Sequence, residues 1–183
     1  AIGSLILSEG RTSVLTARDG RISGPRLLDK FQKGVISSGC DVVDIGEVPT
    51  PLLYFATFKT NISDGVMLTG SHNPKNYNGL KIVINKKSMT SEKIKQIKLM
   101  IEEEGFIDGL GQLTFLDVKD DYLKELKEKI NINSKIKVCL DCGNGVGGAI
   151  APQAFKLLGL DVIELYSEVD GNFPNHHPDP SNP

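Results

Sequence analysis

Residues 13–45 read SVLTARDGRISGPRLLDKFQKGVISSGCDVVDI, and strand and helix patterns alternate along them. Two runs rich in β-branched residues, at 13–17 and 41–45, flank a segment whose apolar residues recur at helical spacing. Ser23 can cap this helix, and Pro25 stands near its first position, where a missing N–H is tolerated. A strand, a helix and a second strand in this order predict a parallel βαβ unit.

The same alternation continues along the rest of the chain. Further strands are expected over 65–69, 80–84, 136–140 and 162–166, and further helices from Pro51 and over 91–105, 119–129 and 149–158. Strands that alternate with helices in this way predict an α/β fold with a largely parallel sheet. A polar break near residues 117–121 divides the chain into a first domain, 1–118, and a second, 119–183.

The composition argues against several classes of partner. The 183 residues carry 21 Lys and Arg against 23 Asp and Glu, so the net charge is -2. A near balance gives no electrostatic footprint for nucleic acid or an anionic membrane, and we expect neither as a partner. The sequence has three cysteines, and their spacing is not that of a disulfide framework. No basic segment precedes the first apolar residues, as it would in a secretory signal. We therefore expect a cytoplasmic protein.

The strongest functional signal is TGSHNP at 69–74, followed by YNGLK at 77–81. These residues begin at the carboxyl end of a predicted strand, which is where open α/β sheets bind their ligands. Asparagine, glycine and proline in these positions also form ordinary polar turns, and spacing alone does not decide between a turn and a site.

The residue types in this loop suit phosphoryl chemistry. Gly70 allows a tight turn, Ser71 offers a hydroxyl, His72 a donor or base, and Lys81 a mobile cation. A serine-hydrolase elbow needs glycine two residues before and after the serine, and neither position holds one here. A phosphorylated Ser71 matches better, because backbone amides and two cationic side chains suit about two negative charges.

These residues resemble the α-D-phosphohexomutase superfamily, whose phosphoserine loop reads Thr-Ala/Gly-Ser-His-Asn-Pro and is followed by Tyr-Asn-Gly-x-Lys. The other matching segments are ARDGRISGP at 17–25, VPTP at 48–51, DCGNG at 141–145 and DGNFPNHHPDP at 170–180. Gly70 and the run NHHPDP are most similar to the bifunctional phosphomannomutase/phosphoglucomutase branch. The resemblance implies three-layer α/β/α domains with a mostly parallel mixed sheet.

The activity that the resemblance implies is an intramolecular phosphotransfer between O1 and O6 of a mannose or glucose phosphate. Phosphorylated Ser71 would donate its phosphoryl group to the sugar phosphate, and the hexose 1,6-bisphosphate intermediate would return the other group. His72 would neutralise and position this group, and Lys81 would act as general acid or base. Arg18, Arg21 and Asn73 would support the loop or the substrate.

Mg²⁺ is the implied cofactor, bound in part through a phosphoryl oxygen on Ser71. The aspartates that complete the family's metal loop, its sugar-recognising segment and its last phosphate-binding loop have no counterpart in this sequence. We therefore expect this chain to be an N-terminal piece of a longer mutase. Its partners would be the C-terminal domains of that mutase, which this chain lacks, and without them we expect no catalytic turnover. The loop from Gly70 to Gly79 should be mobile without its phosphoryl group, because only Tyr77 offers apolar anchorage.

Three alternatives stay open. GNGVGG at 143–148, with Glu164 after it, matches a dinucleotide-binding fingerprint, although glycines that merely permit a tight turn are the favoured interpretation. A phosphoglucosamine mutase or a non-catalytic α/β module is also compatible with the residues. Cys139 and Cys142 lack a second zinc-ligand pair, and the polar cluster at 176–179 suits hydrogen bonds better than a metal.

Overall fold

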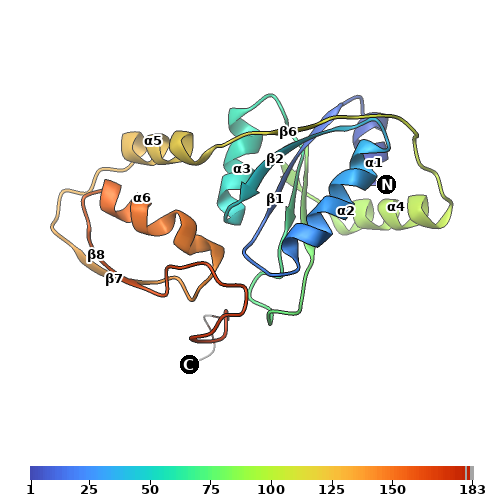
Figure 1. The fold of residues 1–183 in the computed structure, drawn as a ribbon. Coiled ribbons are helices and arrows are strands. Elements are labelled where there is room, and N and C mark those ends of the chain that lie inside the picture. The colour runs from blue at the N-terminus through green and yellow to red at the C-terminus, as the bar shows by residue number, and fades with distance from the viewer. Residues whose placement is uncertain (180, 182–183) are drawn as a thin grey trace.

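The computed structural model describes residues 1–179 and 181 (Figure 1). Its elements, in chain order, are α1 (Ile2–Ser8), β1 (Ser13–Arg18), α2 (Gly24–Ile36), β2 (Asp41–Glu47), α3 (Thr50–Lys59), β3 (Gly65–Leu68), β4 (Leu80–Ile84), β5 (Lys87–Ser88), α4 (Ser91–Glu102), β6 (Leu113–Phe115), α5 (Lys119–Lys129), β7 (Lys137–Asp141), the 3₁₀ turn η1 (Val146–Ala149), α6 (Ala151–Leu157) and β8 (Asp161–Leu165). For description, residues 1–118 are the first lobe and residues 119–179 the second lobe.

The first lobe contains a six-stranded sheet in the order β5-β4-β3-β1-β2-β6. β1 runs parallel to β2 and β3, β6 runs parallel to β2, and β4 and β5 are antiparallel to their neighbours. The second lobe pairs β7 and β8 in parallel. This topology confirms the predicted α/β fold with a mostly parallel mixed sheet.

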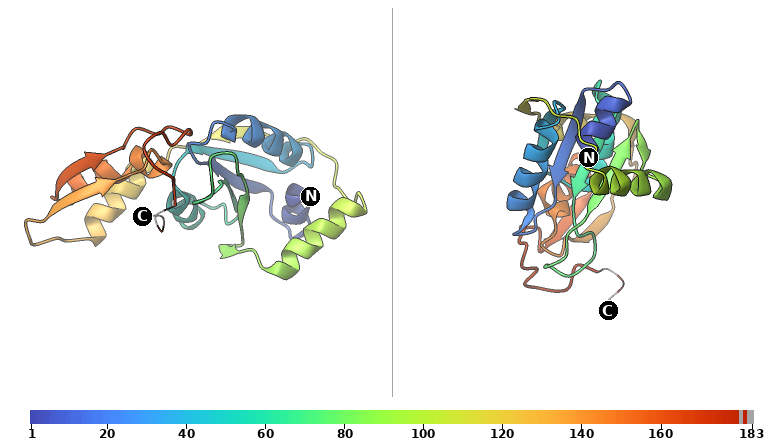
Figure 2. Two further views of the ribbon diagram at one scale, coloured as in Figure 1. Left: turned by 90° about the horizontal axis from the view of Figure 1, so that it is seen from below. Right: turned by 90° about the vertical axis from the view of Figure 1, so that its right-hand side faces the viewer.

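Alternate residues of the central strand β1 face the two sides of the sheet, as a strand requires. Val14 packs with residues of α1 and α2, while the next residue, Leu15, packs with residues of α3. Helices therefore cover both faces of the sheet, which gives the three-layer arrangement seen in Figure 2. The carboxyl ends of β1 and β3 lie next to each other, because these strands are parallel neighbours.

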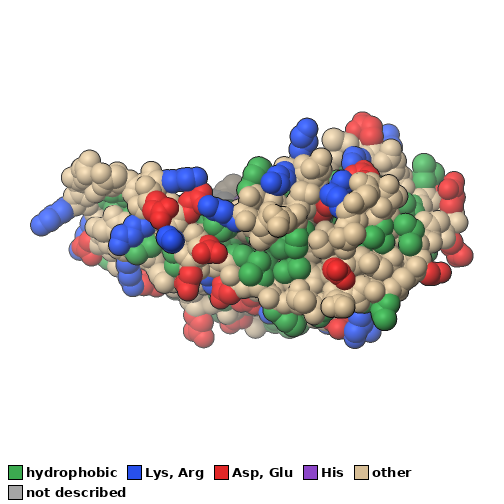
Figure 3. Space-filling model, turned by 90° about the horizontal axis from the view of Figure 1, so that it is seen from above, with side chains coloured by type: hydrophobic (Ala, Val, Ile, Leu, Met, Phe, Trp, Pro, Cys, Tyr) green, Lys and Arg blue, Asp and Glu red, His purple; other side chains and the backbone are tan. Residues whose placement is uncertain are grey.

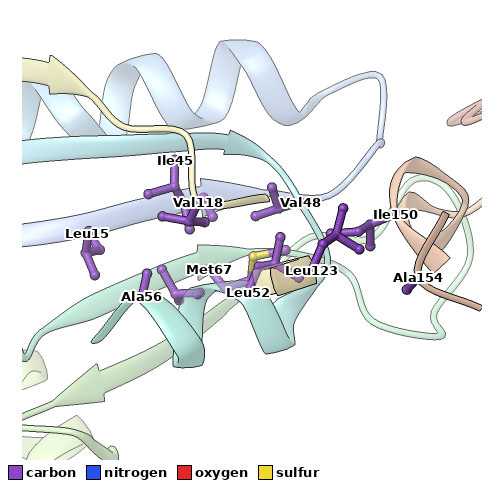
Figure 4. Packing of buried hydrophobic residues seen from close by; sticks show 12 residues of the cluster. Leu15, Ile45, Val48, Leu52, Ala56, Met67, Val118, Leu123, Ile150 and Ala154 are labelled. Atoms are coloured by element: carbon purple, nitrogen blue, oxygen red, sulfur yellow. The ribbon is translucent and has the colours of Figure 1, made fainter. Parts of the chain in front are cut away.

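The second lobe shares a hydrophobic core with the first (Figure 4). Leu123 of α5 and Ile150 and Ala154 around α6 belong to the same buried cluster as Leu15 and Met67. At its edge the ring of Phe55 meets that of Tyr122 edge to face at a centroid distance of 5.3 Å. The charge-rich helix predicted over 119–129 thus has an apolar side, and that side joins the two lobes.

Several boundaries differ from the predictions by one to three residues. Helix α3 begins at Thr50, with Pro49 as its N-cap, rather than at Pro51. Helix α4 ends at Glu102 rather than 105, because Glu104 adopts a left-handed conformation with φ 51°. A 3₁₀ turn at Val146–Ala149 replaces the first residue of the helix predicted over 149–158.

The face of α4 is less buried than helical spacing suggests. Ile97 packs against the core, whereas Ile94 and Ile101 are each more than half exposed. The sequence also gave no indication of α1, β5 and β6 as separate elements.

The surface shows no region of a single charge on the side drawn in Figure 3, where basic and acidic side chains are interspersed around a group of hydrophobic ones. Among residues 1–179 and 181, no helix combines the length and the apolar character that crossing a membrane needs.

Candidate active site

A cavity of about 390 Å³ lies at the carboxyl edge of the large sheet, between the two lobes. Ser71, His72 and Lys81 line it from the first lobe, so the structure brings these three predicted site residues together. The second lobe contributes Asp141, Asn144, Phe173 and His176 to the opposite wall. The sequence did not predict a role for this second wall in the site.

Ser71 lies in a strained loop, residues 69–79, which we call the serine loop. Its φ of 53° is left-handed, a conformation that residues other than glycine adopt rarely. The Ser71 amide donates to Thr69 Oγ1 at 2.9 Å, and the Asn73 side chain donates to the carbonyl of Gly70 at 2.9 Å. Such strain persists only where neighbouring contacts enforce it, and it is concentrated at functional sites.

Asp19 is the residue that fixes the start of the serine loop. Its Oδ2 accepts hydrogen bonds from Thr69 Oγ1 at 2.8 Å and from the Gly70 amide at 3.3 Å. The same oxygen accepts from Arg21 Nε at 3.0 Å. The role of Asp19 was not predicted, although this residue follows β1 directly and so lies beside the carboxyl end of β3.

Arg21 binds the rest of the serine loop through its backbone carbonyls. Its Nη1 donates to the carbonyls of Pro74 and Tyr77 at 2.6 and 3.1 Å. Its Nη2 donates to those of Ser71 and Asn73 at 2.8 and 2.9 Å. With Nε on Asp19, all five guanidinium N–H groups are used, and Arg21 is only 1% exposed.

Gly70 leaves room for this guanidinium. A Cβ built on Gly70 would lie 2.3 Å from Arg21 Cζ, closer than unbonded carbon atoms approach. Glycine at this position therefore has a steric reason in this chain, beyond its freedom to turn.

Tyr77 does not anchor the serine loop through its ring, which is 55% exposed. The expected apolar anchorage is therefore wrong, because the loop is held by hydrogen bonds from Arg21 to its backbone carbonyls. Whether the loop becomes mobile without a phosphoryl group stays a prediction.

Arg18 lies outside the cavity. Its Nη1 donates to Glu47 Oε2 at 2.5 Å and to the carbonyl of Asp19 at 3.0 Å. It thus contacts the backbone of the residue that fixes the serine loop, and reaches the site only through Asp19.

His176 forms a pair with Asp141 on the opposite wall. Its Nε2 lies 3.1 Å from Asp141 Oδ1 and its Nδ1 lies 2.9 Å from the carbonyl of His177. The bond to the His177 carbonyl and the Asp141 carboxylate raise the pKa of His176, and the His176 ring lowers the pKa of Asp141. Both partners are acceptors, so a ring that carries two protons satisfies both.

We expect His176 to titrate above the ordinary histidine value of about 6.5. A group whose pKa is raised by folding stabilises the fold at pH values below its unfolded pKa, and this contribution is lost as the pH rises through the folded pKa. Proton NMR of the imidazole should show the raised pKa, and Asp141→Asn should lower it. An unchanged titration in Asp141→Asn would contradict the pairing.

The described residues offer few ligands for the predicted Mg²⁺. Within residues 1–179 and 181, no three His, Cys, Asp or Glu side chains are grouped so that they could hold a metal ion. Asp19, the carboxylate nearest the serine loop, already accepts from Arg21, Thr69 and Gly70. Since Mg²⁺ requires close to six oxygen ligands, the described residues do not form its site by themselves.

The glycine-rich segment at 143–148 is explained by packing. Gly143 has φ +52°, and a Cβ on Gly148 would lie 2.0 Å from the carbonyl oxygen of Ser167. Glu164, the candidate ribose ligand, pairs with Lys156 at 2.5 Å. These contacts account for Gly143, Gly148 and Glu164 without a dinucleotide.

The fold and the site together define a three-layer α/β domain with a serine loop at the carboxyl edge of its sheet. The family model described as phosphoglucomutase/phosphomannomutase, alpha/beta/alpha domain I, matches residues 1–108. The corresponding model for domain II matches residues 120–183. The chain belongs to the phosphoglucomutase/phosphomannomutase family.

Individual relatives agree with this assignment. The chain is 48% identical over its whole length to a phosphomannomutase/phosphoglucomutase of Pseudomonas aeruginosa, of which it covers 40%. It is 42% identical to a phosphoglucomutase of Neisseria meningitidis, again covering 40% of that protein. A crystal structure of a family protein from Burkholderia thailandensis superposes with a TM-score of 0.94 at 39% identity, covering 97% of this chain and 41% of the other.

The chain thus spans about 40% of the length of the curated relatives it matches. The division at residues 118 and 119 stays a prediction, as do the roles of the individual site residues. Pro180, the last residue of the DGNFPNHHPDP segment, and Pro183 lie outside the described residues.

Proposed function

We propose that the protein to which this chain belongs is a phosphohexomutase. It would interconvert the 1-phosphates and 6-phosphates of mannose, glucose or both through a phosphoserine at Ser71 and a hexose 1,6-bisphosphate. The observation that supports this most is the conformation of Ser71, which Asp19, Thr69 and Arg21 hold at the wall of a cavity that also contains Lys81.

The residues would divide the transfer as follows. A sugar hydroxyl attacks the phosphorus on Ser71, so a new bond from phosphorus to the sugar oxygen forms and the bond to Ser71 Oγ breaks. Lys81 is the proposed general base that accepts the proton of that hydroxyl. The electron pair of the broken bond stays on Ser71 Oγ, which is the leaving group. His72, which lines the same cavity as Ser71, would donate to the phosphoryl oxygens. The reverse transfer returns the second phosphoryl group to Ser71.

Arg21 has a supporting role in this scheme. Its five N–H groups are already occupied by Asp19 and by four carbonyls of the serine loop. It therefore has no donor left for a substrate and would act by fixing the loop.

Mg²⁺ would supply positive charge at the oxygens of the transferred group. This chain would offer it one ligand, the Ser71 phosphoryl oxygen. The remaining ligands and the residues that recognise the sugar are proposed to come from C-terminal domains of the full-length protein, and residues 1–183 alone are expected to be inactive.

Lys81→Met should lower kcat of the full-length protein by about 10²-fold, the usual contribution of a general acid or base. Lys87→Met is a matched control, because Lys87 lies on the neighbouring strand β5 and outside the cavity. Equal kcat values for the two variants would exclude Lys81 as the proton carrier.

A coupled assay on the full-length protein with the 1-phosphates of glucose, mannose and glucosamine tests the function. Turnover of glucose or mannose phosphate is expected. Turnover of glucosamine phosphate alone would assign the protein to phosphoglucosamine mutases instead. No turnover of any of them would contradict the proposal, and a shift in melting temperature with NADH would then favour dinucleotide binding.

A further inference from the structure

Phe173 has a backbone conformation that its side chain does not favour. Its φ of 51° is left-handed, where a bulky residue is rarely found. The turn is closed by a hydrogen bond from the Phe173 amide to the carbonyl of Asp170 at 2.9 Å. Glycine or asparagine would adopt this conformation more easily, so the strain indicates that the ring itself is needed where it lies.

The Phe173 ring lies over the guanidinium of Arg21. The distance from Arg21 Cζ to the ring centroid is 5.5 Å, within the range of a cation–π interaction. Because the five N–H groups of Arg21 lie in its plane and are all hydrogen-bonded, only the two faces of the group remain for further contacts. Phe173 occupies one of these faces, at the wall of the cavity that contains Ser71.

The backbone around Phe173 also fits the first lobe closely. A Cβ on Gly171 would lie 2.6 Å from the carbonyl oxygen of Gly20 and 2.7 Å from the amide nitrogen of Ile22. A Cβ on Gly20 would in turn lie 2.2 Å from the side chain of Val169. The segment at 169–173 therefore rests directly on the residues that flank Arg21, and Figures 1 and 2 show it beside the connection from β1 to α2.

A chain of contacts thus runs from the second lobe to the serine. Phe173 contacts Arg21, and Arg21 donates to the carbonyl of Ser71 and to three further carbonyls of the serine loop. Removing water from one face of a guanidinium strengthens its in-plane hydrogen bonds, since these bonds are stronger where the dielectric is lower.

We propose that Phe173 is a positioning residue for Ser71. The Phe173 ring covers the Arg21 guanidinium and thereby keeps the serine loop in the conformation that presents Ser71 to the cavity. The expected effect of Phe173 on catalysis rests on the proposed function. The effect of Phe173 on the order of the serine loop does not depend on that function. It also gives the second lobe a specific task, because the ring that orders the serine loop comes from that lobe.

Hydrogen exchange of the serine loop in the full-length protein tests this proposal. Phe173→Leu retains an apolar side chain and similar backbone strain but lacks the π face. We expect its amides at 73–79 to exchange about threefold to tenfold faster, which corresponds to the loss of one cation–π contact. In the mutase assay kcat should fall while KM for the hexose phosphate stays close to wild type. Phe173→Tyr should restore both readouts, because it restores the ring.

Phe58→Leu is the matched control. Phe58 makes a similar contact with Lys86, at 5.2 Å, but its exposed ring lies on α3 and takes no part in the core that joins the two lobes. Its exchange at 73–79 should equal that of wild type. If Phe173→Leu does not fold, Phe173→Met provides the same comparison with a more flexible side chain.

The outcomes separate the two proposals. Wild-type exchange at 73–79 in Phe173→Leu or Phe173→Met would overturn the positioning role, whatever the activity. Faster exchange in a protein without mutase activity would leave the positioning of the loop standing and refute the proposed function.

Discussion

Replacing Ser71 with alanine should lower the mutase activity of the full-length protein by about 10³-fold or more, because the variant lacks the hydroxyl that would carry the phosphoryl group. The coupled assay measures this loss directly. The fold should survive, because the Ser71 hydroxyl is exposed and only its backbone N–H and C=O take part in the contacts with Thr69 and Arg21.

Two further variants make the Ser71 result specific. Ser71→Gly suits the left-handed φ of 53° and lacks the hydroxyl, so it should be as inactive as the alanine variant without its strain. Ser37→Ala removes a hydroxyl at the end of α2, which bonds only to the carbonyl of Gly34, and should retain full activity. Substantial activity in Ser71→Gly would exclude the phosphoserine mechanism.

Replacing Arg21 with methionine should destabilise the protein by about 3–5 kcal/mol, the usual cost of leaving one partner of a buried ion pair alone. The variant would remove the cation paired with Asp19 and the side-chain donor of four loop carbonyls. Urea unfolding measures the loss. The double variant Asp19→Asn, Arg21→Met should be less destabilised than the sum of the single variants, because it leaves no buried charge unpaired.

Arg18→Met is the control for Arg21. Arg18 is also paired with a carboxylate, that of Glu47, but both side chains are partly exposed and the pair lies outside the cavity. A pair of this kind contributes about 1 kcal/mol or less. Equal losses for Arg18→Met and Arg21→Met would show that the buried network does not hold the serine loop.

The sequence predicted the regular parts of the fold because their patterns are local. The strand expected at 13–17 corresponds to β1. The strand expected at 41–45 corresponds to β2, which extends two residues further, to Glu47. β6 could not be predicted, because it has only three residues, all of them exposed. Its strand geometry depends on pairing with β2, a contact that no local pattern encodes.

The three residues that line the cavity from the first lobe were predicted, but the contacts that support them were not. Ser71, His72 and Lys81 could be identified because their residue types and their place after a strand suggest phosphoryl transfer. Asp19 could not, because its role depends on β1 and β3 being neighbours. Phe173 was read only as part of a family segment, since its contact with Arg21 spans the two lobes. The anchor expected of Tyr77 was wrong because a buried cation, not an apolar ring, binds the loop.

The most direct test of the central claim is to map phosphate on the full-length protein. The protein would be incubated with a hexose 1,6-bisphosphate, digested and analysed by peptide mass spectrometry. We predict phosphate on Ser71, and its loss when a hexose 1-phosphate is added. Mutase turnover without phosphate on Ser71, or with phosphate on another residue, would contradict a phosphoserine mechanism at Ser71.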